Sequence, residues 1–204
     1  MSVKFINNMD NRHSMRGIFR ERIIRVLLNA PDGTLTKYRV AKEAGASTNW
    51  TVEYLQKLEA LDLVRGTEVL DTDRLITFWA KISRKPIHFN FFHNNPEKML
   101  RETNREYALT TYLAENLMNH YLFPSRTDIY IPEKEFPFWK QSFIRGGLVG
   151  NGNVRLLVSD SHVFYQKKRI NKLWTVSTPQ LLLDLKIEGG VAREAYDLMV
   201  NKYV

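Results

Sequence analysis

The sequence predicts an α+β protein in two parts, in which three helices and a β-hairpin precede a region of mixed α/β structure. Apolar residues recur at helical spacing in the first part, whereas β-prone runs alternate with helical segments in the second. A basic break that contains Pro86 separates them. The 204 residues are 44% hydrophobic, enough for a core in each part. We therefore expect a flexible lead-in at 1–12, a first domain at 13–85 and a second at 86–204.

The charge balance favours a polyanionic partner. The chain has 30 Lys and Arg residues against 22 Asp and Glu residues, a formal net charge of +8, which places nucleic acid first and an anionic membrane surface second. The absence of cysteine excludes disulfides, thiolate zinc sites and thiol nucleophiles. No apolar run is long enough to span a bilayer, and the first residues lack the apolar core of a signal peptide. We expect a cytoplasmic protein with no membrane partner.

Capping residues define the three helices of the first domain. The first helix is expected from Gly17 to residue 28, and its arginines spread around it, which leaves open whether they form a solvated or a DNA-facing surface. Thr36 can cap a second helix that stops at Gly45, and Ser47 can cap a third over 48–60. The core stripe of the third helix and the residues that continue it are expected to be Val52, Leu55, Leu58, Leu61 and Leu63, with Trp50, Glu53, Tyr54 and Lys57 off the stripe.

A hairpin is expected after the third helix. Two β-prone runs, 63–70 and 74–82, flank a polar turn at 71–73. Three helices followed by a hairpin is the order of a winged helix-turn-helix domain, which places its third helix in the major groove of double-stranded DNA. Phosphate contacts are expected from Thr36, Lys37 and Arg74. Residues near the bases are expected to be Thr48, Asn49, Trp50 and Glu53, with Ser47 and Lys57 as further DNA-binding residues.

Two features of the third helix argue for modest specificity or for another role. It has no arginine, the commonest base reader, and phosphate would repel Glu53 unless Glu53 accepts from a cytosine amine. In the alternative interpretation Trp50 and Tyr54 pack on the second domain, and the fold is a protein-interaction module without DNA binding.

The second domain is expected to mix strands and helices. Strands are predicted at 87–92, 127–131, 154–158, 163–165 and 174–176. Helices are predicted at 97–119 (one or two), at 133–144, after a cap at Thr178, and from Val191 onward. Glycines near residues 146–152 are interpreted as loop residues, because they lack the spacing of a phosphate-binding loop.

No catalytic site, metal site or cofactor is predicted in the second domain. The five histidines include no pair at the spacing of helical metal ligands, and Asp160 and His162 are too close in sequence to form a triad with Ser161. Nucleotidyltransferases hold magnesium with two carboxylates one residue apart on a strand, but Tyr130 stands where the partner of Asp128 would be. A degenerate relative of that fold remains an alternative. A metal-dependent nucleotidyltransferase- or nuclease-like enzyme would have to join Asp128, Asp160 and Asp184.

Four segments of the second half carry a family resemblance: 107–114, 127–132, 153–158 and 176–185. They resemble the AbiEi antitoxins of type IV toxin–antitoxin systems, which join an N-terminal winged helix to a C-terminal α/β domain. The resemblance implies an autorepressing transcriptional regulator whose second domain counters a nucleotidyltransferase toxin. Whether a toxin partner exists, and whether the chain forms a homodimer, the sequence leaves open. Asp184 is expected to have a structural role in its capped helix.

Overall fold

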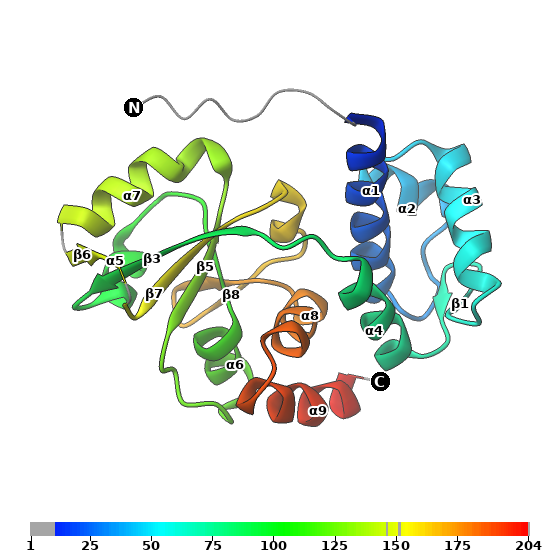
Figure 1. Ribbon diagram of the computed structural model, residues 1–204. Coiled ribbons are helices and arrows are strands. Elements are labelled where there is room, and N and C mark those ends of the chain that lie inside the picture. The colour runs from blue at the N-terminus through cyan, green and yellow to red at the C-terminus, as the bar shows by residue number, and fades with distance from the viewer. Residues whose placement is uncertain (1–10, 146, 151, 204) are drawn as a thin grey trace.

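The computed structural model describes residues 11–145, 147–150 and 152–203, and shows a helical unit beside a sheet unit (Figure 1). The first helix, α1 (Asn11–Leu28), begins before Gly17, so residues 11 and 12 are helical and the predicted lead-in was wrong there. Residues 1–10 of that lead-in lie outside the described residues. Within the described residues, no helix combines the length and apolar character needed to cross a membrane.

The helical unit continues with α2 (Lys37–Ala44) and α3 (Thr48–Glu59), and both predicted caps are confirmed. The Thr36 hydroxyl accepts from the Arg39 N–H, and the Ser47 hydroxyl accepts from the Trp50 N–H. Gly45 ends α2 with φ at 67°, in the left-handed region that glycine adopts without strain. These local interactions set the turn between the two helices.

The predicted hairpin was wrong in its second strand. The hairpin lies entirely within the first β-prone run, as β1 (Val64–Arg65) and β2 (Glu68–Val69), with Gly66 at φ 63° in the turn. Residues 74–82 belong instead to helix α4 (Thr72–Ile82), because Asp71 caps it and Leu75, Ile76 and Trp79 form one buried helical face. The Asp71 cap and the helical spacing of the buried residues therefore outweigh the strand propensity of this segment.

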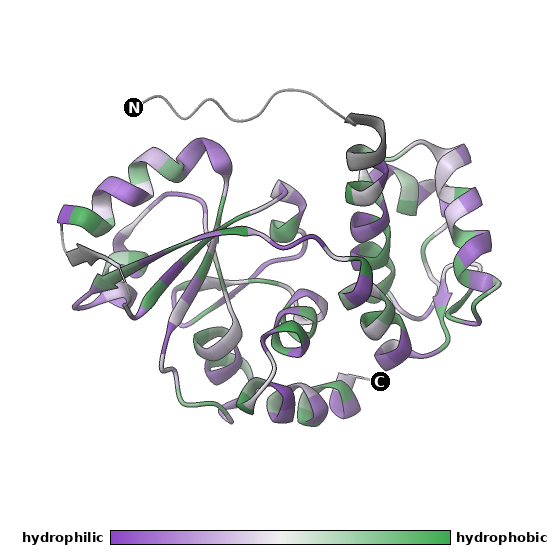
Figure 2. Cartoon of the chain, in the orientation of Figure 1, coloured by the Kyte–Doolittle hydropathy of each residue, from purple (hydrophilic) through white to green (hydrophobic). Residues whose placement is uncertain are grey.

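Helix α1 is buried on all sides over its last six residues. Residues 23–28 are all buried, since α1 lies between α2 and α4 of its own unit and α8 (Thr178–Glu188) of the sheet unit. Hydrophobic residues run along both α1 and α8 (Figure 2). One continuous core therefore joins the two units.

The sheet unit contains a mixed seven-stranded sheet of order β6-β3-β7-β5-β4-β9-β8. Its strands are β3 (Ile87–His93), β4 (Ala108–Thr110), β5 (Thr127–Ile131), β6 (Gly147–Val149), β7 (Val154–Val158), β8 (Lys168–Ile170) and β9 (Leu173–Thr175). The central strands β5 and β7 are parallel, with Asp128 beside Arg155 and Tyr130 beside Leu157. An α+β architecture is thus confirmed.

Helices cover both faces of the sheet (Figure 1). One face carries α7 (Phe136–Arg145), whose Trp139 and Phe143 rings contact Tyr107 and Phe91. The other face carries α6 (Thr111–Asn119), α8 and α9 (Val191–Tyr203), while α5 (Pro96–Glu102) connects β3 to β4. Side chains alternate along a strand, so Asp128, Tyr130 and Arg155 lie on the α8 face.

Several expectations for the second half need correction. The segment 97–119 contains β4 as well as two helices, and residues 163–165 lie in or beside a short 3-10 helix, Ser161–Phe164, instead of a strand. Strand β8 was not predicted, and β9 begins one residue before the predicted strand. Ser177, not Thr178, is the cap residue of α8. The strands predicted at 87–92, 127–131 and 154–158 are confirmed.

Candidate nucleic-acid interface

Helices α2 and α3 are joined by a tight turn. After Gly45 the Ala46 N–H bonds back to the Ala41 carbonyl at 2.9 Å, so the chain turns within three residues before α3 begins. Buried side chains hold α3 from behind; they are Val40, Ala44, Leu55 and Leu58. Packing fixes the inner face of α3 and leaves its outer face to solvent.

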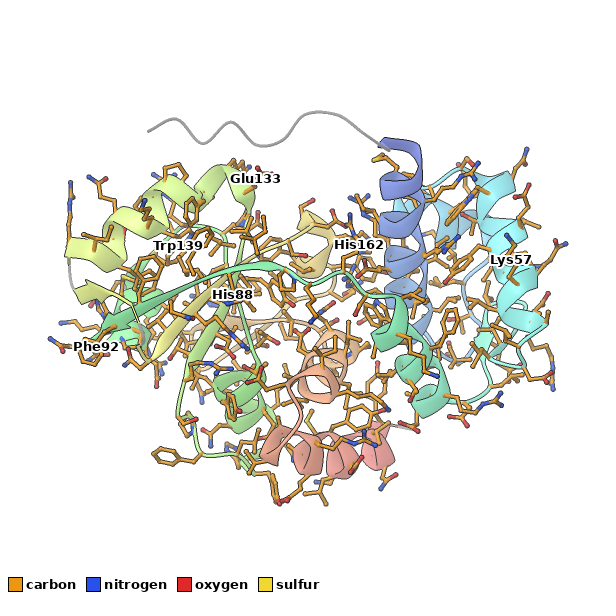
Figure 3. The ribbon with its side chains drawn as sticks, viewed as in Figure 1. Lys57, His88, Phe92, Glu133, Trp139 and His162 are labelled. Carbon is orange, nitrogen blue, oxygen red and sulfur yellow. The ribbon has the colours of Figure 1, made fainter. Side chains whose placement is uncertain are left out.

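The outer face of α3 is open. Asn49, Glu53 and Gln56 recur at helical spacing and are exposed, as are Ser47, Thr48 and Lys57. Helix α3 lies on the side of the molecule away from the sheet (Figure 1), and Lys57 points outward from it (Figure 3). The sheet unit therefore does not cover the residues predicted to approach bases.

Trp50 and Tyr54 are packing residues of the helical unit. Their rings stack with centroids 5.4 Å apart, and the Trp50 ring lies 6.0 Å from that of Phe19 on α1. Tyr54 is 5% exposed, so the expectation that it lies off the core was wrong; Leu61, expected in the core, is 48% exposed. Burial raises the pKa of Tyr54. These two aromatic rings contact α1 and each other. They therefore do not pack on the sheet unit, as the interpretation as an interaction module had expected.

The predicted phosphate contacts separate into two groups. Thr36 and Lys37 lie at the start of α2, where Thr36 is exposed and Lys37 partly so. Arg74 lies on α4 instead of a wing, and its guanidinium donates to the carbonyl of Leu61 at 3.1 Å. Arg65, which sequence reasoning missed, occupies the hairpin with a 77% exposed side chain. An arginine directly before a Gly-Thr turn was the available signal.

Two arginines of α1 face the sheet unit and not a solvent surface. Arg22 forms a two-pronged ion pair with Asp160, at 2.6 and 2.5 Å. Arg25 is 3% exposed and donates from Nε to the Gln180 side-chain carbonyl at 2.8 Å. These arginines join the two units, so they are not available to DNA.

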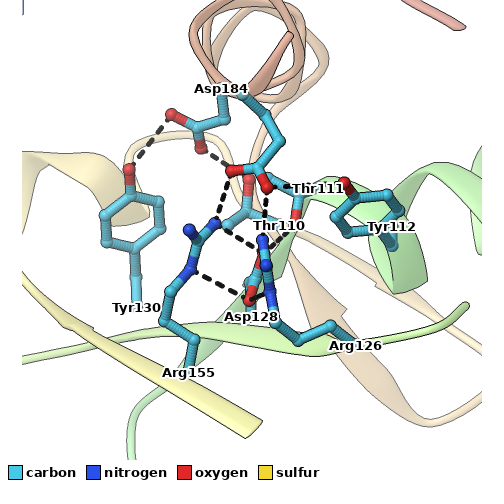
Figure 4. A network of polar contacts seen from close by, with 9 residues as sticks. Thr110, Thr111, Tyr112, Arg126, Asp128, Tyr130, Arg155 and Asp184 are labelled. Carbon is cyan, nitrogen blue, oxygen red and sulfur yellow. Dashed lines mark hydrogen bonds and ion pairs between the residues drawn. The ribbon is translucent and has the colours of Figure 1, made fainter. Parts of the chain in front are cut away.

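A polar network occupies the α8 face of the sheet (Figure 4). Asp128, which is fully buried, accepts from Arg126 at 2.6 and 2.9 Å and from Arg155 at 3.1 and 2.8 Å, and Thr111 donates to it as well. Both arginines also pair with Glu188. Burial lowers the pKa of Arg126, but the hydrogen bonds and charges of Asp128 and Glu188 raise it above its ordinary value overall. The network neutralises Asp128 with fixed cations.

Asp184 of α8 points toward the same face of the sheet, and its hydrogen-bond partners are neutral. Thr110, Tyr130 and Gln180 donate to its carboxylate at 2.5, 3.0 and 2.8 Å. Burial raises the pKa of Asp184 to about 6 despite these donors. Tyr130 of β5 thus holds the Asp184 carboxylate of α8 against the sheet.

The three carboxylates that an enzyme interpretation would join have separate partners. Asp128 is bound by arginines of the sheet, Asp160 by Arg22, and Asp184 by hydroxyl and amide groups. Among the residues that the structure describes, no group of three or more histidine, aspartate or glutamate side chains is arranged to hold a metal ion.

No protein-family model matches the chain, and no curated protein or solved structure was found similar to it.

Proposed function

We propose that the chain is a DNA-binding transcriptional regulator whose helix α3 docks in the major groove. The observation that carries the proposal is the open outer face of α3, with Asn49, Glu53 and Lys57 exposed on a helix that Leu55 and Leu58 anchor. A helix presented in this way fits the width of the major groove. The excess of basic residues supports the same partner.

The order of elements supports a winged-helix interpretation of the helical unit. Asp32, between α1 and α2, forms an isolated β-bridge with Glu68, and the Val69 N–H donates to the Pro31 carbonyl at 2.8 Å, so this segment flanks the hairpin. The hairpin is short, with β1 and β2 of two residues each, and the Thr67 hydroxyl donates to the Leu35 carbonyl at 2.6 Å. In this docking Lys37 and Arg65 approach phosphates on either side of α3, and Lys57 approaches a phosphate from α3 itself.

Base contacts are proposed for the first turns of α3. Asn49 has the amide that pairs with adenine in the major groove, and Glu53 can accept from a cytosine amine. Trp50 has its ring engaged with Phe19 and Tyr54, so it orients the helix from behind. Few base-reading groups remain, and sequence preference is expected to be modest.

The four segments that resemble AbiEi antitoxins extend the proposal to an autorepressor of antitoxin type. In this form of the proposal the sheet unit is a non-catalytic relative of the nucleotidyltransferase fold that contacts a toxin or a second copy of the chain. A nucleotidyltransferase gene beside the gene for this chain would support this extension.

The test is duplex binding by the full chain as a function of salt. With a pool of short random duplexes, fluorescence anisotropy is expected to show affinity that falls steeply as salt rises, and Lys37→Ala with Lys57→Ala is expected to lower the slope of log K against log salt by about 2. Asn49→Ala is expected to change only the preference for a selected site, which the same pool yields by repeated selection.

Matched variants control for charge and position. Lys134→Ala with Lys140→Ala removes two exposed lysines of the sheet unit, and Arg74→Ala removes an arginine that binds carbonyls of its own unit. Neither is expected to change the salt slope. Absence of salt-dependent binding would contradict the DNA-binding proposal. Equal slopes for the Lys37/Lys57 and Lys134/Lys140 variants would contradict the docking through α3.

A further inference from the structure

A cleft lies where the helical unit meets the sheet unit. It consists of two adjoining cavities of about 230 and 250 Å³. The residues that line both are Glu21, Arg25, Arg84, Lys85, Pro86 and Ser159. Elements from both units therefore form the walls, and the segment that connects α4 to β3 forms the rim.

Arg25 places a buried cation in the wall of this cleft. Its Nε donates to Gln180, and its Nη1 donates to His162 Nδ1 at 3.0 Å, while its Cζ lies 5.1 Å from the centre of the Trp79 ring. Within the described part of the chain, no carboxylate is within ion-pair distance of it. A guanidinium that is 3% exposed and paired only with neutral groups is costly to bury.

One edge of that guanidinium is unsatisfied and open. No described residue accepts a hydrogen bond from Nη2. The protein does not fully enclose this atom, in contrast to the three buried side-chain atoms that lack a partner, which belong to Tyr54, Trp79 and Trp139. Arg25 lines both cavities, and Nη2 is the nitrogen of its guanidinium that has no partner among the described residues. A free guanidinium edge in a partly enclosed site is a donor for a carboxylate or a phosphate.

The other lining residues distinguish these two anions. Arg25, Arg84, Lys85 and Arg155 line the cavity of about 230 Å³ together with three acidic residues, so a single negative charge balances the charges of its walls. The acidic side chains are Glu21, Asp184 and Glu188. They would repel a doubly charged phosphate. The remaining walls are largely apolar, formed by side chains such as Leu157, Val163, Leu183 and Ile187, which suits an apolar body attached to the charged group.

We propose that this cleft binds a small monocarboxylate with an apolar body, whose carboxylate accepts from Arg25 Nη2. The occupant contacts α1 and α4 of the helical unit and β7 and α8 of the sheet unit at once. It therefore sets how firmly the two units are held together, which goes beyond binding DNA.

Calorimetry with the full chain tests the proposal, with benzoate as the probe and no DNA present. We expect benzoate to bind with a dissociation constant below about 1 mM, and the neutral isostere benzamide to bind at least tenfold more weakly, about the loss of one charge-assisted contact. Inorganic phosphate is also expected to bind more weakly than benzoate. Preferential binding of phosphate would overturn the choice of a carboxylate. No binding of benzoate up to about 10 mM would overturn the site, whatever the result with DNA.

Three variants show where the probe binds. Ala80 lines the cavity of about 230 Å³, so Ala80→Leu fills space there without changing Arg25; its neighbour Lys81 is exposed and does not line the cleft. Ala80→Leu is expected to weaken benzoate binding at least tenfold, whereas Lys81→Ala leaves it unchanged. Arg25→Lys keeps the charge, loses the planar fork and is expected to weaken binding as well. Equal affinity in Ala80→Leu and Lys81→Ala would refute the location.

Discussion

His162 connects the helical unit to the sheet unit in its neutral form. Its Nδ1 accepts from Arg25 at 3.0 Å, its Nε2 then donates to the Glu43 carbonyl at 3.0 Å, and its ring stacks on Tyr165. A proton on Nδ1 would face the N–H group of Arg25. Burial first, and the charge of Arg25 second, lower the pKa of His162 to about 4.

Asp184, which hydrogen bonds through Arg25 and Gln180 connect to His162, has the opposite behaviour. Gln180 accepts from Arg25 and donates to Asp184, so the two titrating groups share Arg25 as a neighbour. Burial raises the pKa of Asp184 to about 6, so this carboxyl takes up a proton more readily in the folded chain than in the unfolded one.

The two shifts act on stability with opposite signs between about pH 7 and pH 5. On acidification the unfolded chain protonates His162 before the folded chain does, which lowers the free energy of unfolding by about 2 kcal/mol at pH 5. The folded chain protonates Asp184 first, which raises the free energy of unfolding by about 1 kcal/mol over the same interval. The two contributions partly cancel in the unaltered chain.

Single substitutions separate the two contributions. Urea unfolding at about pH 7 and about pH 5 is expected to show that His162→Gln gains about 2 kcal/mol relative to the unaltered chain on acidification, whereas Asp184→Asn loses about 1 kcal/mol. His120→Gln, at an exposed histidine, is the matched control and is expected to change neither value. If His162→Gln and His120→Gln show the same pH dependence, the reasoning about the junction is refuted.

Four further substitutions test the fold around the two candidate sites. Leu55→Ala is expected to cost about 3 kcal/mol in urea unfolding, because Leu55 is fully buried behind α3; a loss below about 1 kcal/mol would contradict its anchoring role. Gly45→Ala is expected to cost about 1 kcal/mol through its left-handed backbone, whereas Gly17→Ala, with open space in α1, is expected to stabilise by up to about 1 kcal/mol. Equal melting temperatures would contradict this. Asp128→Asn is expected to cost about 3 kcal/mol because two arginines lose a buried partner, and unchanged unfolding would show that Glu188 suffices.

The parts of the fold that the sequence predicted depend on contacts a few residues apart. Thr36, Gly45 and Ser47 cap or end helices through bonds to residues at most four positions away, so their residue types alone indicate the α2–α3 turn. The strands β5 and β7 are short apolar runs between polar turns, a pattern that is also local. The proposed DNA-binding face was therefore accessible from sequence.

The cleft was not accessible from sequence, because its partners are far apart along the chain. Arg25 and Gln180 are separated by 155 residues, and Arg22 and Asp160 by 138. An arginine on a helix predicts only a charged side chain at some angle around the axis, and the burial of α1 on all sides depends on where α8 lies. The sequence showed a basic helix and suggested a solvated or DNA-facing surface; the fold turns two of its arginines inward. Under the proposed docking Arg22 and Arg25 contribute no phosphate contacts, which is why the salt slope is expected to respond to Lys37 and Lys57 and not to the two arginines that join the units.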